Sequence, residues 1–283
     1  MFNFLHTFHP NPILFTLGPV AIHWYGLLVV LGIVAGIAVA TWLAKKYGIK
    51  SDQVIDLAFW LVIFGLLGGR LYAVFLFADY YFSHPLEIFA VWRGGLAIHG
   101  AIIAGAITLW VYAKKKQQSF WQWADIVVVA LALGQAIGRW GNYFNQELFG
   151  KPTSLPWGIP IDIANRPQEF LQSEFFHPTF LYESLLNLVV FGILLTLHLR
   201  RIKKDCHPDP AAAGEGSPGL QYGIIALIYL ILYSAVRIGL EFLRIDETPA
   251  ALGVRWPIVV SGMIILAAIW LMIQMRKKVH LEK

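Results

Sequence analysis

The sequence is poor in charge and contains a single cysteine. Charged residues make up 14% of the chain and hydrophobic residues 58%, whereas about 25% of the residues of a soluble domain are charged. Cys206 has no partner for an intramolecular disulfide, and we expect it to be inert in a cytoplasmic loop. The composition excludes an ordinary soluble domain and indicates an integral membrane protein.

Motifs for nucleotide or metal chemistry are also absent. The chain has no Walker A motif, no Gly-x-Ser-x-Gly elbow, no kinase signature and no acidic metal motif. Its nine histidines are scattered, without a His-Glu-x-x-His motif or Cys/His pairs. We therefore expect neither a metal nor a cofactor.

Seven apolar runs are long enough to cross a bilayer as helices, which requires about 20 residues each. They occupy residues 20–44, 54–77, 95–113, 121–140, 177–199, 220–243 and 255–275. A β-barrel is excluded because the runs are continuous rather than alternating. The first twelve residues have no basic region and no small-residue cleavage site, so the first span is expected to be a retained anchor. The prediction is a single all-α membrane domain over residues 1–283.

Basic residues gather on one side of this arrangement. Fourteen of the 22 lysines and arginines follow the first, third, fifth and seventh spans. By the positive-inside rule that side is cytoplasmic, which places the N-terminus outside and the C-terminus inside. The net charge of +5 therefore reports topology and does not indicate nucleic-acid binding.

Three connecting segments stand out by composition. Residues 80–94 are predicted to lie along the outer membrane interface, and residues 145–176 to form a small extracytoplasmic cap. Residues 203–219 are predicted to form a flexible cytoplasmic linker. No internal repeat is visible, which argues against the transporter folds built from repeated halves.

Arginines lie within the apolar runs. A charge at the bilayer centre costs about 2.5–3.5 kcal/mol on insertion scales, so such residues usually face the protein interior. At about 1.5 Å per residue, Arg70, Arg139 and Arg237 lie roughly 24–27 Å above the cytoplasmic ends of their spans. This shared outer level predicts a pocket for an anion.

Two clusters accompany these arginines. Tyr233, Arg237, Glu241 and Arg244 are spaced four, four and three residues apart, so they are predicted to share one helical face. An alternative is that Arg237 and Glu241 only neutralise each other, but this leaves Arg139 unexplained.

The run at residues 138–147 is the densest polar motif. Its glycines allow close backbone approach, while Arg139 and Asn142 offer donors and Glu147 an acceptor. An interfacial helix end with outward-reaching polar groups is the alternative. Glu183 must be protonated or paired in the apolar layer, and we expect it to hold one of the arginines.

His99 closes a glycine-rich run at the start of the third span. A lone histidine at a helix start is often a hydrogen-bonded structural group. The alternative is acid–base catalysis, for which an ordinary pKa near 6.5 is suitable.

At these residues the chain resembles the prolipoprotein diacylglyceryl transferase family of bacterial inner membranes. The resemblance rests on HWYG at 23–26, GGRLY at 68–72, GGLAIHG at 94–100, GRWGNYFNQE at 138–147 with Gly150, HPTFLYE at 177–183 and the Tyr233-to-Arg244 run. It covers nearly the whole chain. One departure is Ala101, where a second glycine commonly follows the motif histidine.

The resemblance implies a multi-pass inner-membrane enzyme that moves the diacylglyceryl group of phosphatidylglycerol to the lipobox cysteine of a preprolipoprotein. A thioether forms and glycerol phosphate leaves. We expect the cap to receive the signal peptide, and the remaining partners to be membrane lipids.

Residue roles follow from combining the resemblance with the polar clusters. His99 is predicted to take the thiol proton, directly or through Tyr233, and the identity of the base stays open. Arg139 and Arg237 are predicted to hold the phosphate during catalysis. The predicted phosphatidylglycerol-binding residues are Arg139, Asn142, Glu147, Tyr25, Arg70, Gly150, Glu241 and Arg244.

Two rival functions make different predictions. A transporter or lipid scramblase would place polar residues across the full thickness or at the midplane, whereas Asp56 and Asp125 lie near the cytoplasmic ends of their spans. A structural scaffold would not need several buried arginines.

Overall fold

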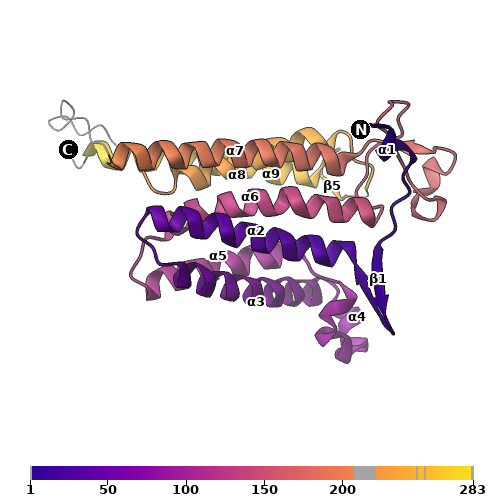
Figure 1. Cartoon of the computed structure of the whole chain (residues 1–283), viewed down its shortest axis with the longest axis horizontal. Coiled ribbons are helices and arrows are strands. Elements are labelled where there is room, and N and C mark those ends of the chain that lie inside the picture. The colour runs from indigo at the N-terminus through magenta and orange to yellow at the C-terminus, as the bar shows by residue number, and fades with distance from the viewer. Residues whose placement is uncertain (1, 207–220, 247, 252, 282–283) are drawn as a thin grey trace. The chain divides into compact units, whose positions relative to one another are not determined.

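The computed structural model describes residues 2–206, 221–246, 248–251 and 253–281. Its long elements are all α-helices (Figure 1). Within the described residues, six helices are long and apolar enough to span a membrane: α2 (Trp24–Lys46), α3 (Ser51–Leu76), α6 (Phe120–Phe144), α7 (Thr179–Cys206), α8 (Ile224–Glu241) and α9 (Trp256–Leu281). The chain is therefore a multi-pass membrane protein.

A further long helix, α5 (Ile98–Lys115), corresponds to the predicted third span. It is not among the six because its 18 residues include His99 and two lysines, Lys114 and Lys115, which lower its apolar content. Each of the seven predicted runs overlaps one helix. The predicted linker at 203–219 begins too early, since α7 continues to Cys206, and most of the rest of it lies outside the described residues.

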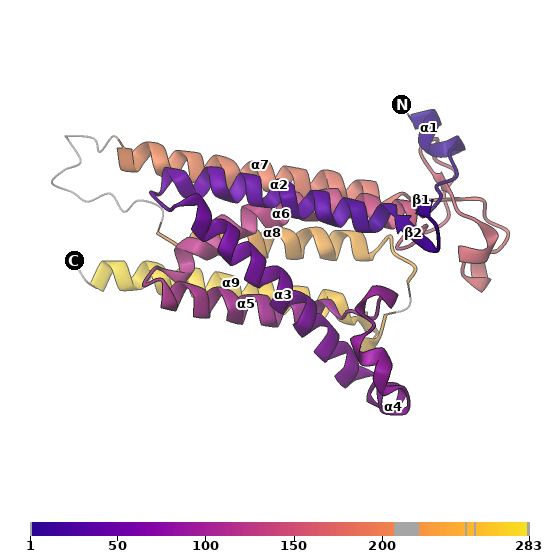
Figure 2. The ribbon, with the colours of Figure 1, turned by 60° about the horizontal axis from the view of Figure 1, so that its bottom comes forward.

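The chain forms two compact units, Met1–Val39 with Val128–Lys283 and Ala40–Val127. In the first unit, α8 packs against both α7 and α9 (Figure 2). Close backbone approach joins α2 to α6, because a Cβ atom on Gly32 would lie 3.2 Å from the carbonyl oxygen of Gly134. Small residues at such crossings let membrane helices pack by van der Waals contact.

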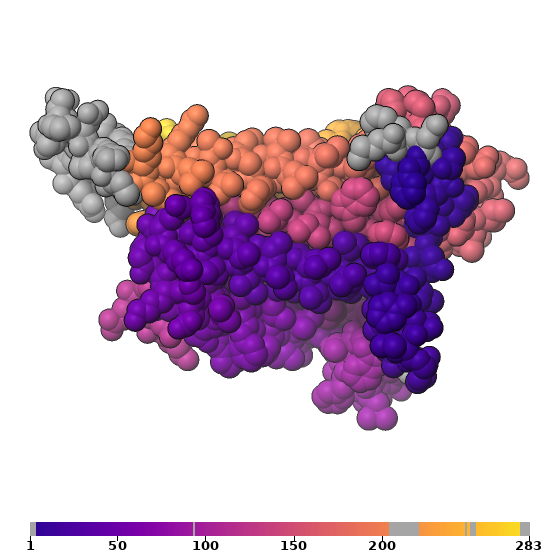
Figure 3. Space-filling view, in the orientation of Figure 1, coloured from indigo at the N-terminus to yellow at the C-terminus, as the bar shows by residue number. Residues whose placement is uncertain are grey.

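The segment at 145–176 packs beside the short N-terminal helix α1 (Phe2–Thr7), as the space-filling view shows (Figure 3). Strand β3 (Ile159–Pro160) pairs antiparallel with β4 (Phe175–Phe176). The ring of His6 stacks on Phe175 at 3.9 Å, and its Nδ1 lies 2.9 Å from the carbonyl oxygen of Gly158. A small apolar core thus fastens the cap to the ends of α6 and α7, and its buried members are Leu5, Tyr143, Phe149, Ile159, Ile161, Phe176 and Phe180.

Two short hairpins interrupt the predicted all-α pattern. Strands β1 (Ile13–Leu17) and β2 (Val20–His23) precede α2, with Gly18 at φ 58° in their turn. Strands β5 (Ala250–Ala251) and β6 (Val254–Arg255) precede α9. Neither was predicted, since two- to five-residue strands carry little periodic signal.

In the second unit, α3 packs along α5. A Cβ atom on Gly68 would lie 2.6 Å from the carbonyl oxygen of Gly100, and one on Gly100 would overlap the carbonyl oxygen of Gly68. The predicted interfacial stretch follows α3 as α4 (Ala78–Ser83) and the 3₁₀ turns η1 (Pro85–Phe89) and η2 (Val91–Arg93).

The α3–α5 contact predicts different effects for two alanine substitutions on α5. Gly100→Ala should lower stability by about 1–3 kcal/mol, because backbone atoms must separate to admit the methyl group. Gly105 is the matched control, since its Cβ would meet only Leu61 at 4.0 Å, and Gly105→Ala should be neutral or slightly stabilising. Thermal unfolding in detergent measures both, and equal melting temperatures for the two variants would contradict this packing.

Candidate active site

Charged side chains of the first unit gather where α6 and α8 end and where α7 and α9 begin. Arg139 lies near the end of α6, Glu183 in the first turns of α7 and Arg237 one turn before the end of α8. Arg255 directly precedes α9. This is the end of the unit that carries α1 (Figure 1). The shared level that the sequence predicted for Arg139 and Arg237 is therefore present within this unit.

Glu241 is a buried carboxylate shared by two arginines. Nη2 of Arg237 lies 2.8 Å from its Oε2, and Nε of Arg255 lies 2.9 Å from its Oε1. The side chain of Glu241 is fully enclosed. The geometry agrees with the prediction that Glu241 orders Arg237, and it does not fit an isolated Arg237–Glu241 pair.

Arg255 also closes the backbone that follows α8. Its Nη1 donates to the carbonyl oxygen of Arg244 at 2.7 Å, and its Nη2 to that of Asp246 at 2.5 Å. Its Nε also lies 2.8 Å from Oγ1 of Thr248. Carbonyl groups beyond a helix end need such donors. Sequence reasoning missed Arg255, although a signal existed: it is one of few basic residues on the predicted outer side, where positive charge is scarce.

Glu183 plays the corresponding role on α7. Its Oε1 forms an ion pair with Nη2 of Arg139, and its Oε2 lies 3.8 Å from Nη1 of Arg244. Glu183 is 2% exposed. The prediction that it holds one of the arginines is confirmed, and it contacts a second arginine as well.

Asparagines extend the network from Arg139. Nη1 of Arg139 donates to Oδ1 of Asn142 at 3.2 Å, and Nδ2 of Asn142 donates to Oε1 of Glu147 at 2.8 Å. Asn145 donates to the same oxygen at 3.3 Å. Glu147 therefore orders Arg139 through Asn142.

Arg244 does not lie on the helical face that the spacing predicted, because α8 ends at Glu241. Its guanidinium forms a bidentate pair with Asp246 at 2.9 and 3.0 Å. Bidentate pairs of this kind fix geometry as well as charge. Only 5% of the Arg244 side chain is exposed, so it is the most enclosed of the arginines in this cluster.

Gly150 and Tyr25 shape the surroundings by packing. A Cβ atom on Gly150 would lie 2.9 Å from both His177 and Thr179, so only glycine fits where the cap meets α7. One on Gly141 would lie 2.5 Å from the ring of Tyr25. Gly150 and Tyr25, both predicted to bind lipid, are thus closely packed against neighbouring residues.

Tyr233 lies one turn before Arg237 on α8 and is close enough to interact with its charge. Its ring stacks on Tyr229 at 5.8 Å. Tyr229 in turn donates from its hydroxyl to Oε1 of Gln135 on α6 at 3.0 Å. The Tyr229 hydroxyl thus links this stacked pair to the helix that carries Arg139.

Three arginines of the cluster keep accessible surface. The side chain of Arg255 is 27% exposed, and those of Arg139 and Arg237 are 21% and 18% exposed. Among the residues that the structure describes, Nη1 of Arg237 is buried without a hydrogen-bond acceptor. A buried charged donor without a partner costs more than the 1–3 kcal/mol or so of a neutral one. An anionic oxygen at this position would remove that cost.

In the second unit, Arg70 has a structural role that the sequence did not predict. Its Nε donates to the carbonyl oxygen of Ile88 at 2.9 Å, and its Nη1 to those of Gly94 and Gly95 at 2.7 and 2.9 Å. Nη2 donates to the carbonyl oxygens of Glu87 and Ala90. All five N–H groups of a guanidinium are thereby used. Arg70 holds the interfacial stretch in place, and this arrangement leaves no donor for a lipid phosphate.

His99 lies in the first turn of α5, directly after this stretch. Its side chain is exposed, and its ring lies 6.0 Å from that of Tyr72 on α3. The backbone leading to it is anchored, because the amide of Ala97 donates to the carbonyl oxygen of Gly69 at 3.0 Å. Both Arg70 and His99 belong to the second unit, whereas the network around Glu183 and Glu241 belongs to the first.

His177, between the cap and α7, is a further titratable group. Burial lowers the pKa of its imidazole, which favours the neutral ring. Its Nδ1 lies 3.2 Å from the hydroxyl of Tyr182, which also accepts a hydrogen bond from Nε1 of Trp157 at 2.8 Å. These contacts tie α7 to the cap.

Comparison with known proteins decides the family. The family model described as prolipoprotein diacylglyceryl transferase matches residues 12–274. Relatives named phosphatidylglycerol–prolipoprotein diacylglyceryl transferase occur in Nostoc sp., with 44% identity over 84% of this chain and 80% of the relative, and in Synechococcus elongatus, with 45% identity over 84% and 78%. One from Prochlorococcus marinus is 40% identical over 88% of this chain and 82% of its own length.

The chain belongs to the prolipoprotein diacylglyceryl transferase family. It is accordingly a membrane transferase of lipoprotein biosynthesis, and it transfers a diacylglyceryl group in lipoprotein maturation. Most of the arginine–carboxylate network lies in the segments on which the family resemblance rests, namely those at 138–150, 177–183 and 233–244. Arg255 and Asp246 lie outside those segments.

In this transferase, Arg70→Lys should lower the stability of the fold and leave binding of the lipid substrate unchanged. Lysine has three donors without the planar fork, so at least two of the five carbonyls lose a charged partner, a loss of about 3 kcal/mol. We expect a lower melting temperature in detergent and faster proteolysis within residues 84–95. Arg166→Lys is the control, because Arg166 contacts carbonyls of Ile161 and Leu171 at the surface of the cap. An unchanged melting temperature with a raised KM for the lipid donor would show instead that Arg70 binds phosphate.

Proposed function

We propose that the chain transfers the diacylglyceryl group of phosphatidylglycerol to the lipobox cysteine thiol of preprolipoproteins. The observation that carries this proposal is the state of Arg139 and Arg237. Both are fixed by buried carboxylates, both keep accessible surface, and Nη1 of Arg237 has no acceptor among the described residues. The names of the relatives, which specify phosphatidylglycerol and prolipoprotein, support the choice of substrates.

The proposed reaction forms one bond and breaks one. The cysteine thiolate attacks the glyceryl carbon of the diacylglyceryl group that bears the phosphate ester. The carbon–sulfur bond forms as the carbon–oxygen bond breaks, and glycerol phosphate leaves with the electron pair. The proton of the thiol passes to a base. The donor phosphate diester carries one negative charge and the leaving monoester carries up to two, so negative charge grows on the phosphate in the transition state.

Fixed guanidiniums suit this charge development. Donors that are already oriented stabilise a growing charge without reorganisation, and they act more strongly in a site that excludes water. Arginine also matches phosphate oxygens in pairs. In the proposed role, Arg139 and Arg237 bind the phosphate, whereas Glu183, Glu241, Asn142 and Glu147 keep the two guanidiniums in position.

A thiol with an ordinary pKa near 8.5 must lose its proton to attack. In the proposal His99 accepts this proton, directly or through Tyr233. The exposed ring of His99 at the anchored start of α5 supports this role. Tyr25 and Gly150 shape the donor pocket through their packing against Gly141 and the cap.

The proposed topology has seven spans, with α5 counted among them, an outer N-terminus and an inner C-terminus. The basic residues gathered at the C-terminal ends of α2, α5, α7 and α9 support it. The proposed location is the bacterial inner membrane. The stretch at 80–94 then lies at the outer interface, the cap at 145–176 receives the signal peptide, and the segment at 203–219 faces the cytoplasm.

Replacing a clamp arginine should cost transition-state stabilisation. We expect Arg237→Lys to lower kcat/KM for phosphatidylglycerol by about 10²–10³-fold, the range for loss of one such donor. The assay is mass spectrometry of a lipobox peptide after incubation with phosphatidylglycerol and reconstituted protein. Arg201→Lys is the matched control, because Arg201 is a buried arginine on α7 that donates to the carbonyl oxygen of Gln221. Equal losses in both variants would contradict a specific clamp.

Replacing the proposed base should separate binding from turnover. His99→Gln keeps a polar side chain but cannot take the proton, so we expect it to abolish adduct formation while phosphatidylglycerol binding stays unchanged. Substantial retained activity would remove His99 as the base. Lipid translocation without any peptide adduct, seen already in the unmodified protein, would instead favour a transporter.

A further inference from the structure

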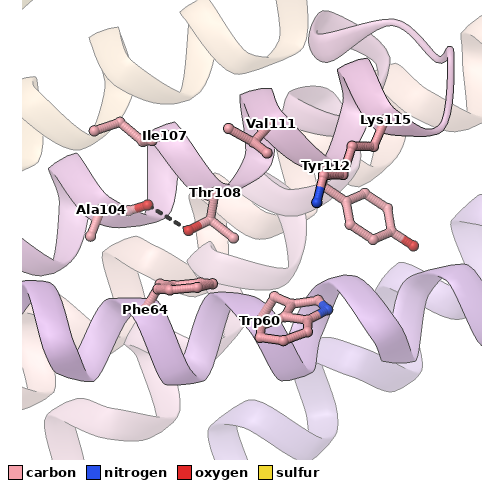
Figure 4. A pocket seen from close by; sticks show the side chains of 8 residues that line it. All are labelled: Trp60, Phe64, Ala104, Ile107, Thr108, Val111, Tyr112 and Lys115. Carbon is pink, nitrogen blue, oxygen red and sulfur yellow. Dashed lines mark hydrogen bonds between the residues drawn. The ribbon is translucent and has the colours of Figure 1, made fainter.

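The second unit contains an apolar groove between α3 and α5 (Figure 4). Trp60 and Phe64 on α3 and Ile107 and Val111 on α5 line a cavity of about 400 Å³. Ligand sites typically enclose about 300–1,000 Å³. All four side chains are exposed large hydrophobic groups, so the groove opens toward the surroundings of the unit.

The two hydroxyl groups that line the groove already have partners. Oγ1 of Thr108 donates to the carbonyl oxygen of Ala104 at 2.7 Å, as the dashed line in Figure 4 shows. The hydroxyl of Tyr112 donates to the carbonyl oxygen of Gln53 at 2.8 Å and lies 3.1 Å from Asp56. The walls therefore favour an apolar ligand such as an acyl chain.

Charge is concentrated at one end of the groove. Lys114 lies over the ring of Trp110 at 5.3 Å, and Lys116 lies 3.7 Å from Asp56. Lys115 lines the groove itself, and within the described part of the chain no ion pair or ring contact is found for it. One cation of the three is thus free to bind an anion.

The dimensions match one leaflet. From Ala104 to Lys115 the groove follows α5 for about 17 Å, at about 1.5 Å per residue. The hydrocarbon core of a bilayer is about 30 Å thick, so each leaflet contributes about 15 Å. A lipid with its phosphate at Lys115 would extend its acyl chain along the whole groove.

We propose that this groove binds one anionic phospholipid, with an acyl chain between α3 and α5 and the phosphate on Lys115. The residues involved differ from those of the proposed transfer site. The proposal does not depend on the transfer reaction, and under the proposed topology the lipid comes from the cytoplasmic leaflet, because Lys115 is at the lysine-rich end of α5.

Tryptophan quenching by brominated lipids tests this proposal. The full-length protein is reconstituted in phosphatidylcholine vesicles that contain increasing fractions of brominated phosphatidylserine or brominated phosphatidylcholine. Phosphatidylserine is anionic but is not the proposed donor, so the result stays independent of the transfer activity. The Trp60 signal is the difference between the unmodified protein and Trp60→Phe. We expect phosphatidylserine to quench this signal at a several-fold lower mole fraction.

Matched variants assign the preference to the groove. Lys115→Gln and the groove-filling Thr108→Phe should abolish the preference, while Lys115→Arg and Lys114→Gln should retain it. Equal quenching by the two lipids would overturn the proposal, since it would mean non-selective surrounding lipid. An equal loss in Lys114→Gln would also overturn it by showing general attraction to a basic surface. A Trp60 signal insensitive to both lipids would indicate a second copy of the chain on this face.

Discussion

Two buried glutamates, each shared by two arginines, are the interactions on which the site depends. Glu183 joins Arg139 to Arg244, and Glu241 joins Arg237 to Arg255. An unpaired ion at such depth costs several kcal/mol, and removing one partner of a buried pair typically costs 3–5 kcal/mol. Each carboxylate therefore neutralises and positions two guanidiniums, and it ties the ends of separate helices together.

The paired cluster has four guanidiniums and three carboxylates, counting Asp246, which leaves one positive charge over. The four arginines have different structural roles. Arg244 is enclosed, and Arg255, although 27% exposed, donates to the backbone after α8, whereas Arg139 and Arg237 are partly exposed and pair with buried carboxylates. Such a division lets part of the network stabilise the fold while the rest presents a fixed positive charge to an anionic ligand. A transferase acting on a charged lipid requires this combination.

Much of the fold and of the charged cluster was predictable from the sequence, and the exceptions have physical reasons. Hydropathy predicted every long helix, and the energetic cost of buried charge predicted the level of Arg139 and Arg237. The face assigned to Arg244 was wrong because the chain leaves α8 at Glu241, which spacing cannot reveal. The contacts of Arg70 with backbone carbonyls were not predicted, because such partners carry no sequence signal, and its phosphate role stays a prediction. The roles of His99 and Tyr233 stay predictions.

A structure of the protein in nanodiscs that contain phosphatidylglycerol would test the central claim most directly. We expect headgroup density between Arg139 and Arg237, with a phosphate oxygen about 2.7–2.9 Å from Nη1 of Arg237, as in charge-assisted hydrogen bonds. The contacts to Glu183 and Glu241 should persist. A headgroup bound elsewhere, with this nitrogen contacted only by water, would contradict the phosphate-binding role of Arg139 and Arg237.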